Sequence, residues 1–331
     1  MKKIIALALV CIVILPLLAA CGGNKAKFEL PQRTTVSDEI KKFGSYEYMV
    51  YDDGTAVITK YTGTESIVTV PETLDGCKVI ELGIDCFGEN TAITSVKIGS
   101  GVEIIGDYAF YDCTSLSSVT IGKNVWSVGV AAFEGTPWLG AQTDEYVIVG
   151  DGVLLKYQGN ASYLTIPAGI KHLSYAFNMN YDLIGVEMGE ELLTIGKYAF
   201  AYCESLRHVV FGPNTVLIDD GAFDSCESLT NVSLPDSVVK IGSYAFNYCS
   251  SIAEMKLGSG VRTINEAAFR NCMRMKVMHM PSTVQTIGDS AFADCLALTL
   301  VFYGGTEQQF SEIYLSSTNY ILKDVTKVYA N

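Results

Sequence analysis

The apolar positions of the chain recur with a fixed spacing. An Ala-Phe or Cys-Phe pair returns every 23 residues from Phe87 to Phe133 and again from Phe177 to Phe292. A fixed period of roughly 20 to 50 residues is typical of a solenoid, in which each repeat stacks on the next. The phenylalanines expected in the core of these coils are Phe87, Phe110, Phe133, Phe177, Phe200, Phe223, Phe246, Phe269 and Phe292.

Each repeat contains two apolar segments that predict two short strands. In the repeat that begins at Phe223, apolar residues alternate only at the end of 229–234, which predicts a short strand entered from a turn. Residues 238–242 predict a second extended run that faces inward. A single coil cannot bury its own inner face, so neighbouring coils must stack. We therefore expect a repeat solenoid of 23-residue coils, built mostly from short parallel β-strands and turns.

The pattern changes between Phe133 and Phe177, which are 44 residues apart. Within this modified coil, at about 136–163, Gly150-Asp151-Gly152 lies between two apolar runs and predicts a β-hairpin. Strand and turn signals at the two ends predict caps that cover the first and last coils. The expected domains are a β-hairpin N-terminal cap at 46–80, the solenoid at 81–303 and a small α/β C-terminal cap at 304–331.

The first residues resemble an export signal. Two lysines precede an almost wholly apolar run over 4–18, which is shorter than the roughly 20 residues needed to span a bilayer. Leu18-Ala19-Ala20-Cys21 resembles the bacterial lipobox, which implies cleavage after residue 20 and a lipid on Cys21. We expect a signal peptide at 1–20 and a flexible polar spacer at 21–45. The alternative is an ordinary cleaved signal with a cysteine that carries no lipid.

Charge narrows the choice of partners. Without the signal, 21 basic residues remain against 36 acidic ones. No basic cluster is present to neutralise phosphate groups, so we expect no nucleic-acid partner. The lipid on Cys21 is then the expected link to the membrane. The protein is predicted to lie outside the cytoplasm, anchored to the bacterial membrane and exposed at the cell surface.

The repeat I/L-P-x-x-V-x-x-I-G-x-x-A-F-x-x-C-x-S-L-x-x-V resembles that of the BspA-like leucine-rich-repeat surface proteins of bacteria. The resemblance covers roughly 46–331 and includes the segment Tyr-Gly-Gly-Thr-Glu-Gln-Gln-Phe that ends at Phe310. It implies a right-handed solenoid of parallel strands, a surface location and, in some members, adhesion to host proteins or other cells. The chain departs from the pattern at Asn90, Thr136 and Asn180, where Cys is expected, and at Asp219 and Asn265, where Gly is expected.

Six cysteines stand three residues after a core phenylalanine: Cys113, Cys203, Cys226, Cys249, Cys272 and Cys295. Leucine-rich repeats place Asn or Cys at a fixed inner position, where a small donor satisfies turn backbone, so we interpret these as structural thiols. A disulfide ladder is the alternative in an exported protein. Coils about 4.8 Å apart argue against it, because the Cβ atoms of a disulfide are about 3.8 Å apart. Cys77 and Cys86 could pair with each other.

No catalytic or metal-binding motif stands out. The three histidines lie at different offsets in different coils, and G-x-S-x-G, H-E-x-x-H and P-loop sequences do not occur. Asp219-Asp220 and Glu190-Glu191 are the candidate carboxylate pairs for a glycoside hydrolase, although adjacent turn carboxylates are usually solvated. We expect no enzyme, no cofactor and no metal.

Two sets of residues are candidates for ligand binding, because a solenoid presents one residue per coil in columns. Two neighbouring columns of outward strand positions become apolar towards the C-terminus, one at His279 and Phe302 and the other at Val277 and Leu300. Tyrosine is a favoured interface residue, and tyrosines flank the core phenylalanines at Tyr108, Tyr111, Tyr198, Tyr202, Tyr244 and Tyr248. These tyrosines could instead pack between coils without any ligand. The function expected is non-enzymatic binding of a protein or glycan; a structural or inhibitory envelope protein, or a surface glycoside hydrolase, is the alternative.

Overall fold

The structure is a computed structural model that describes residues 28–31 and 33–330. The predicted signal peptide and the predicted lipid on Cys21 lie outside these residues. Within the part that is described, no helix is long and apolar enough to cross a membrane.

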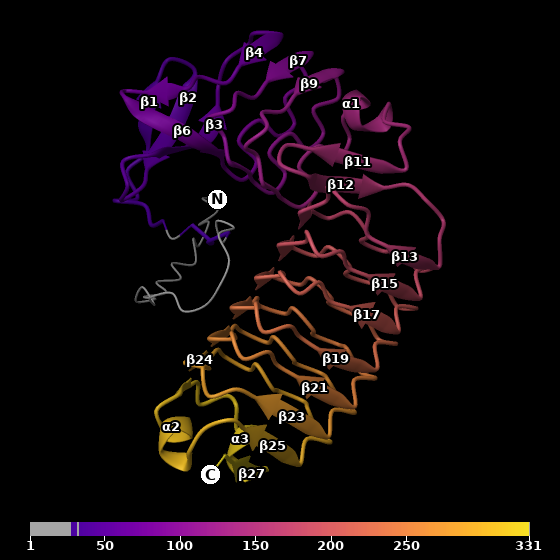
Figure 1. The fold of residues 1–331 in the computed structure, drawn as a ribbon. Coiled ribbons are helices and arrows are strands. Elements are labelled where there is room, and N and C mark those ends of the chain that lie inside the picture. The colour runs from indigo at the N-terminus through magenta and orange to yellow at the C-terminus, as the bar shows by residue number, and fades with distance from the viewer. Residues whose placement is uncertain (1–27, 32, 331) are drawn as a thin grey trace, which may run out of the picture.

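The predicted solenoid is confirmed. Each regular coil contributes a strand of three or four residues and a strand of two residues, and each strand pairs in parallel with its equivalent one coil later. Asn231 lies beside Glu254, for example, and Lys240 beside Thr263. The stack curves into a hook, with the longer strands along its outer side and the two-residue strands along its inner side (Figure 1).

The outer strands of the described chain form three parallel sheets. They are β4 (Ile67–Thr69), β7 (Ser95–Lys97) and β9 (Ser118–Thr120); β13 (Tyr163–Thr165), β15 (Gly185–Glu187) and β17 (His208–Val210); and β19 (Asn231–Ser233), β21 (Glu254–Lys256), β23 (Val277–Met280), β25 (Leu300–Tyr303) and β27 (Thr326–Tyr329).

The inner strands form two sheets in the same part of the chain. The first contains β1 (Lys41–Phe43), β2 (Tyr46–Val50), β3 (Ala56–Tyr61), β5 (Thr73–Leu74), β6 (Cys77–Leu82), β8 (Ile104–Ile105) and β10 (Ser127–Val128). The second contains β11 (Tyr146–Val149), β12 (Val153–Tyr157), β14 (His172–Leu173), β16 (Thr194–Ile195), β18 (Leu217–Ile218), β20 (Lys240–Ile241), β22 (Thr263–Ile264), β24 (Thr286–Ile287) and β26 (Tyr314–Leu315).

The core phenylalanines stack face to face along the solenoid. All nine are at most 2% exposed. Neighbouring rings are 4.8 to 5.7 Å apart between centroids and lie within 29° of parallel. Because one ring fills the same place in each coil, removal of one ring takes contacts from both neighbours.

The backbone around each phenylalanine turns through left-handed corners. In the coil of Phe200, Tyr198 and Tyr202 have φ values of 51° and 60°. The N–H groups of these three residues donate to carbonyls of the next coil, Asp220 at 3.0 Å and two others at 2.8 Å. These bonds form a third ladder, beside those of the outer strands and of the inner strands. It holds non-glycine residues in a left-handed conformation that normally costs them about 1–2 kcal/mol each.

The six repeat cysteines are thiols, as predicted. The Cys226 Sγ donates to the carbonyl of Phe200 at 3.1 Å, and the other five make the same bond to a phenylalanine 26 residues earlier, at 3.0 to 3.3 Å. At Asn90 the amide oxygen instead accepts from two backbone N–H groups of the following turn. Cys77 and Cys86 are also free thiols, so the pairing considered for them does not form.

The modified coil divides the core into two clusters of buried residues, one over 48–155 and one over 154–325. Here the short helix α1 (Pro137–Gly140) begins at Thr136, whose hydroxyl accepts from the Leu139 N–H, and β11 and β12 pair as an antiparallel hairpin. The ring of Trp138 covers Phe133, and the ring of Tyr157 covers Phe177. The phenylalanine stack is therefore interrupted where the hook bends.

The N-terminal cap contains a third strand beyond the predicted hairpin. Strand β1 pairs antiparallel with β2, so the flexible spacer predicted at 21–45 does not extend to residue 45. All three residues of β1 are exposed, so no alternation of apolar residues marks this strand in the sequence. It is held by backbone pairing and by a turn at Gly44, where φ is 56°.

The C-terminal cap contains two short helices, α2 (Glu307–Ser311) and α3 (Ile321–Asp324), beside β27. The cap also accepts hydrogen bonds from the corner N–H groups of the last coil, which have no following coil to donate to. The Ser290 N–H donates to the Thr318 hydroxyl at 2.7 Å, and the Phe292 N–H donates to the Asn319 side-chain oxygen at 3.0 Å. These side chains take the place of the carbonyls of a following coil.

Candidate binding surface at the inner bend

The inner side of the bend brings distant coils into contact. The Lys197 Nζ lies 2.8 Å from the Asp107 Oδ2, although the coils of Phe133 and Phe177 lie between theirs in sequence. Burial opposes the charged form of Lys197, but the Asp107 carboxylate raises the pKa of Lys197 above its ordinary value. The Asp107 Oδ1 also accepts from the Val130 N–H at 2.9 Å. This ion pair therefore links the coils on either side of the modified coil along the inner face.

Four tyrosines gather beside this ion pair. Tyr175 is half-buried, and its pKa is raised by burial and by its neighbours Tyr108, Glu134, Tyr202 and Tyr198. Three of the four tyrosines belong to the predicted set, whereas Tyr175 was missed. We call Tyr108, Tyr175, Tyr198 and Tyr202 the tyrosine cluster.

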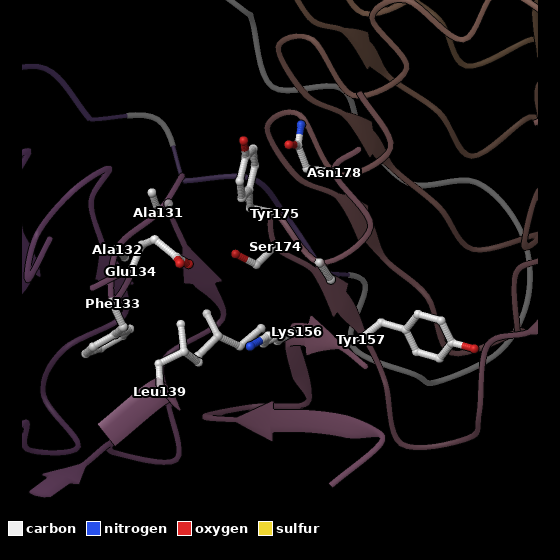
Figure 2. Close-up of a pocket in the computed structure, with 13 residues that line it drawn as sticks. Ala131, Ala132, Phe133, Glu134, Leu139, Lys156, Tyr157, Ser174, Tyr175 and Asn178 are labelled. Atoms are coloured by element: carbon white, nitrogen blue, oxygen red, sulfur yellow. The ribbon is translucent and has the colours of Figure 1, made fainter. Parts of the chain in front are cut away.

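A cavity of about 210 Å³ opens next to the tyrosine cluster, between the coils of Phe133 and Phe177 (Figure 2). Tyr175 forms part of its wall. Polar groups that line it come from both sides of the break and include Glu134, Lys156, Ser174 and Asn178. The cavity therefore combines an aromatic face with both hydrogen-bond donors and acceptors.

The other predicted tyrosines lie outside this cluster. Tyr111 packs edge-on against Tyr108 with centroids 5.6 Å apart, and the Tyr244 hydroxyl donates to a Glu266 carboxylate oxygen at 3.0 Å. Tyr248 is 45% exposed and stands two coils beyond Tyr202. Tyr198 packs between coils, as the alternative holds. Its ring lies so close to Gly221 in the next coil that a Cβ atom at Gly221 would be 2.3 Å from it.

The predicted apolar column forms a second patch, on the outer side of the hook. Val277 pairs with Leu300, and His279 pairs with Phe302, in strands β23 and β25. The His279 ring stacks on Phe302 at 4.9 Å, and its Nε2 lies 2.9 Å from a Glu254 oxygen. Val328 in β27 continues the patch beside Phe302. We call Val277, His279, Leu300, Phe302 and Val328 the outer patch.

The carboxylate pairs considered for hydrolysis serve the turns of the coils. The Asp220 Oδ1 accepts from the Ser243 N–H at 2.7 Å, and the Glu191 carboxylate accepts from the Gly169 N–H at 2.6 Å. Burial and the neighbouring Asp220 charge raise the pKa of Asp219. Residues 28–31 and 33–330 contain no group of three His, Cys, Asp or Glu side chains that could hold a metal ion.

Comparison with models of known protein families identifies the repeat. A model of the BspA type leucine rich repeat region matches six copies over 69–144 and 159–299, more than half of the chain. The gap between these matches contains the whole β11–β12 hairpin. No curated protein matches the chain.

Solved structures of two bacterial proteins are among those that resemble the chain. A leucine-rich cell surface protein from Faecalibacterium prausnitzii is 22% identical, with 85% of this chain and 99% of that chain covered and a TM-score of 0.40. The pneumococcal vaccine antigen PcpA is 15% identical over 90% of this chain and 100% of its own, with a TM-score of 0.48. The repeat, its phenylalanine and thiol columns and the family match agree: the chain belongs to the BspA-type leucine-rich-repeat family.

Proposed function

We propose that the protein is a non-enzymatic binding protein of the bacterial cell surface, which holds a protein or glycan partner at the tyrosine cluster. One observation carries the proposal: the ion pair between Asp107 and Lys197 brings the adjacent residues Tyr108 and Tyr198, from the two arms of the hook, to the inner bend beside a polar cavity. Tyrosine faces stack on sugar rings and on apolar side chains, while the polar groups of the cavity fix orientation.

The backbone at these tyrosines supports a role beyond folding. Tyr108 and Tyr202 are 43% and 40% exposed at φ values of 58° and 60°, where glycine is the most favourable residue. Gly135 stands at the position equivalent to Tyr202 in another coil, and Gly221 at the position equivalent to Tyr108. The fold therefore accepts glycine at these corners, and the turn itself does not require a tyrosine. Contact with a ligand gives a reason for a large, exposed aromatic side chain at these positions.

The chain contains a matched control for this proposal. Tyr248 occupies the same corner position as Tyr202, with a similar φ and a similar exposed fraction, but lies outside the tyrosine cluster. Adhesion of protein-coated beads to host cells, and binding to a glycan array, should fall at least about tenfold for Tyr202→Ala with Tyr175→Ala. Tyr248→Ala should bind as the unmodified protein does. Equal loss in both variants, or no loss in either, would remove the tyrosine cluster as the binding site.

The proposal includes a lipid anchor on Cys21. The lipobox-like sequence before this residue supports it. Cys21→Ser should move a folded protein from the membrane fraction to the soluble fraction, because the described fold does not depend on this residue. If this variant stayed in the membrane fraction, the apolar run at 4–18 would have to hold it there.

The outer patch is a second candidate, favoured by the stack of His279 on Phe302, which is 38% exposed. Substitution of Val277, Leu300 and Phe302 by Asp places three charges on this patch and should abolish binding there. Unchanged adhesion of the triple variant would exclude the outer patch.

A further inference from the structure

The first described residues run along the inner face of the hook and end in the N-terminal cap (Figure 1). Phe28 packs edge-on against Trp126 with centroids 5.2 Å apart, and its ring lies 5.3 Å from that of His172. Trp126 precedes β10 in the first inner sheet, and His172 begins β14 in the second. One aromatic side chain therefore spans the break between the two cores.

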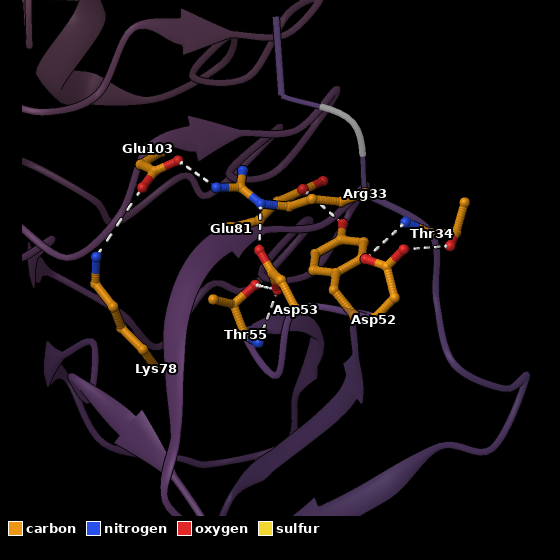
Figure 3. Close-up of polar contacts among 9 residues, drawn as sticks. Arg33, Thr34, Asp52, Asp53, Thr55, Lys78, Glu81 and Glu103 are labelled. Atoms are coloured by element: carbon orange, nitrogen blue, oxygen red, sulfur yellow. Dashed lines mark hydrogen bonds and ion pairs between the residues drawn. The ribbon is translucent and has the colours of Figure 1, made fainter. Parts of the chain in front are cut away.

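A second side chain fixes the segment five residues later. The Arg33 Nε donates to the Asp53 carboxylate at 2.9 Å, and its Nη2 donates to Glu103 at 3.1 Å (Figure 3). Glu103 lies just before β8 and Asp53 in the turn between β2 and β3. The two charged contacts are charge-assisted, which makes them stronger than ordinary hydrogen bonds.

Between and beyond these two anchors the segment has the features of a bound extended peptide. Phe28 and Leu30 are half-buried while the residues after each are exposed. Its end pairs by backbone with the cap, through the Val36 N–H to the Val50 carbonyl at 2.9 Å and through the Asp52 N–H to the Thr34 carbonyl at 2.9 Å. Backbone pairing with pockets for alternate side chains is a recurrent mode of peptide recognition.

The segment and the surface beneath it each keep a buried polar group without a hydrogen-bond partner. His172 is 1% exposed, its Nδ1 lies 2.9 Å from the Thr194 hydroxyl, and its Nε2 finds no hydrogen-bond partner among the described residues. The Arg33 Nη1 is also buried without a partner in that part of the chain. Unmade hydrogen bonds weaken an association, so a peptide that satisfied the His172 Nε2 would bind more tightly than the internal segment does.

We propose that the inner surface formed by Trp126, His172, Glu103 and Asp53, which we call the peptide site, binds an extended peptide that carries an aromatic residue and, five residues later, an arginine. Residues 28–31 and 33–36 occupy the peptide site within the chain, and the peptide segment of a partner protein displaces them. This site is distinct from the tyrosine cluster, so the two proposals stand or fall separately.

The test uses the full chain with Phe28→Ala and Arg33→Ala, which weakens the internal segment without removing it. The probe is a fluorescein-labelled peptide of sequence Phe-Glu-Leu-Pro-Gln-Arg-Thr-Thr-Val, followed by fluorescence anisotropy. The doubly substituted protein should bind this peptide at least about tenfold more tightly than the unmodified protein, in which residues 28–36 compete at high effective concentration. The single variant Phe28→Ala serves if the double variant proves unstable.

Two controls assign the binding to the peptide site. A peptide with Ala in place of Phe and Arg should bind at least about tenfold more weakly, and so should the labelled peptide when Trp126→Ala or Glu103→Gln is added to the protein. Tyr202→Ala should leave peptide binding unchanged. The proposal would be overturned if the two peptides bound equally, if the unmodified and substituted proteins bound equally, or if neither Trp126→Ala nor Glu103→Gln changed the binding.

Discussion

The interrupted phenylalanine stack predicts that the two arms of the hook unfold separately when one of them is weakened. Phe223 lies in the second core with its ring 5.2 Å from both Phe200 and Phe246. Substitution of a buried Phe by Ala costs about 3–5 kcal/mol. With a urea dependence of about 2 kcal/mol per M, Phe223→Ala should lower the midpoint of the second arm by about 2 M.

The positions of the tryptophans make this measurable. Trp138 packs on Phe133 in the first core, so in a Trp126→Phe background its fluorescence reports the first arm, whereas far-UV circular dichroism reports both. Phe223→Ala should move the circular dichroism transition to lower urea and leave the fluorescence transition in place. Phe110→Ala should move the fluorescence transition. If Phe223→Ala shifted both signals equally, the modified coil would couple the two cores and our reasoning would be refuted.

Three further predictions concern the corners, the buried histidine and the thiols. Tyr248→Gly should be more stable than Tyr248→Ala by about 1 kcal/mol in urea unfolding, because Ala retains the left-handed strain; the opposite order would contradict the corner geometry. Burial lowers the pKa of His172 to about 4, so between pH 6.5 and 4 the unfolded chain binds a proton that the folded chain lacks. The free energy of unfolding should therefore decrease by up to about 3 kcal/mol as the pH is lowered from 6.5 to 4. His172→Asn should remove that dependence on pH. Cys249→Ala should cost about 1–2 kcal/mol, whereas Cys77→Ala, at a half-buried site, should cost under about 0.5 kcal/mol; similar losses would argue against the thiol ladder.

The regular part of the fold could be predicted because each coil depends mainly on its neighbours. Phe246 and Cys249 recur at a 23-residue interval, and a residue repeated in stacked coils must lie in one column. The left-handed corners could not be predicted, because Tyr244 and Tyr248 are not residues that normally mark a positive φ. They are held by hydrogen bonds from one coil to the next, which no local pattern reveals.

The candidate sites were predicted only in part. Tyr175-Ala176-Phe177 repeats the motif of Tyr198, so Tyr175 could have been found, but the irregular spacing of its coil hid it. The sequence showed that the repeat is broken but not which way the stack bends, and the contact between Lys197 and Asp107 depends on that direction. The docking of Phe28 on Trp126 is likewise a contact between segments far apart in the chain, within a stretch that composition marks as a spacer.

The corner hydrogen bonds form a column of peptide dipoles that all point the same way along the solenoid axis. Each corner N–H points to the following coil and each corner carbonyl to the preceding one, as from Phe200 to Ala222. The corner peptide dipoles, of about 3.5 D each, therefore point in the opposite sense to those of an α-helix, whose N–H groups point to its N-terminus. The inner strands oppose this column, because their N–H groups donate to the preceding coil, as from Asp219 to Ile195. Two antiparallel columns of peptide dipoles thus run side by side along an acidic solenoid, and their fields are local ones that its net charge does not reveal.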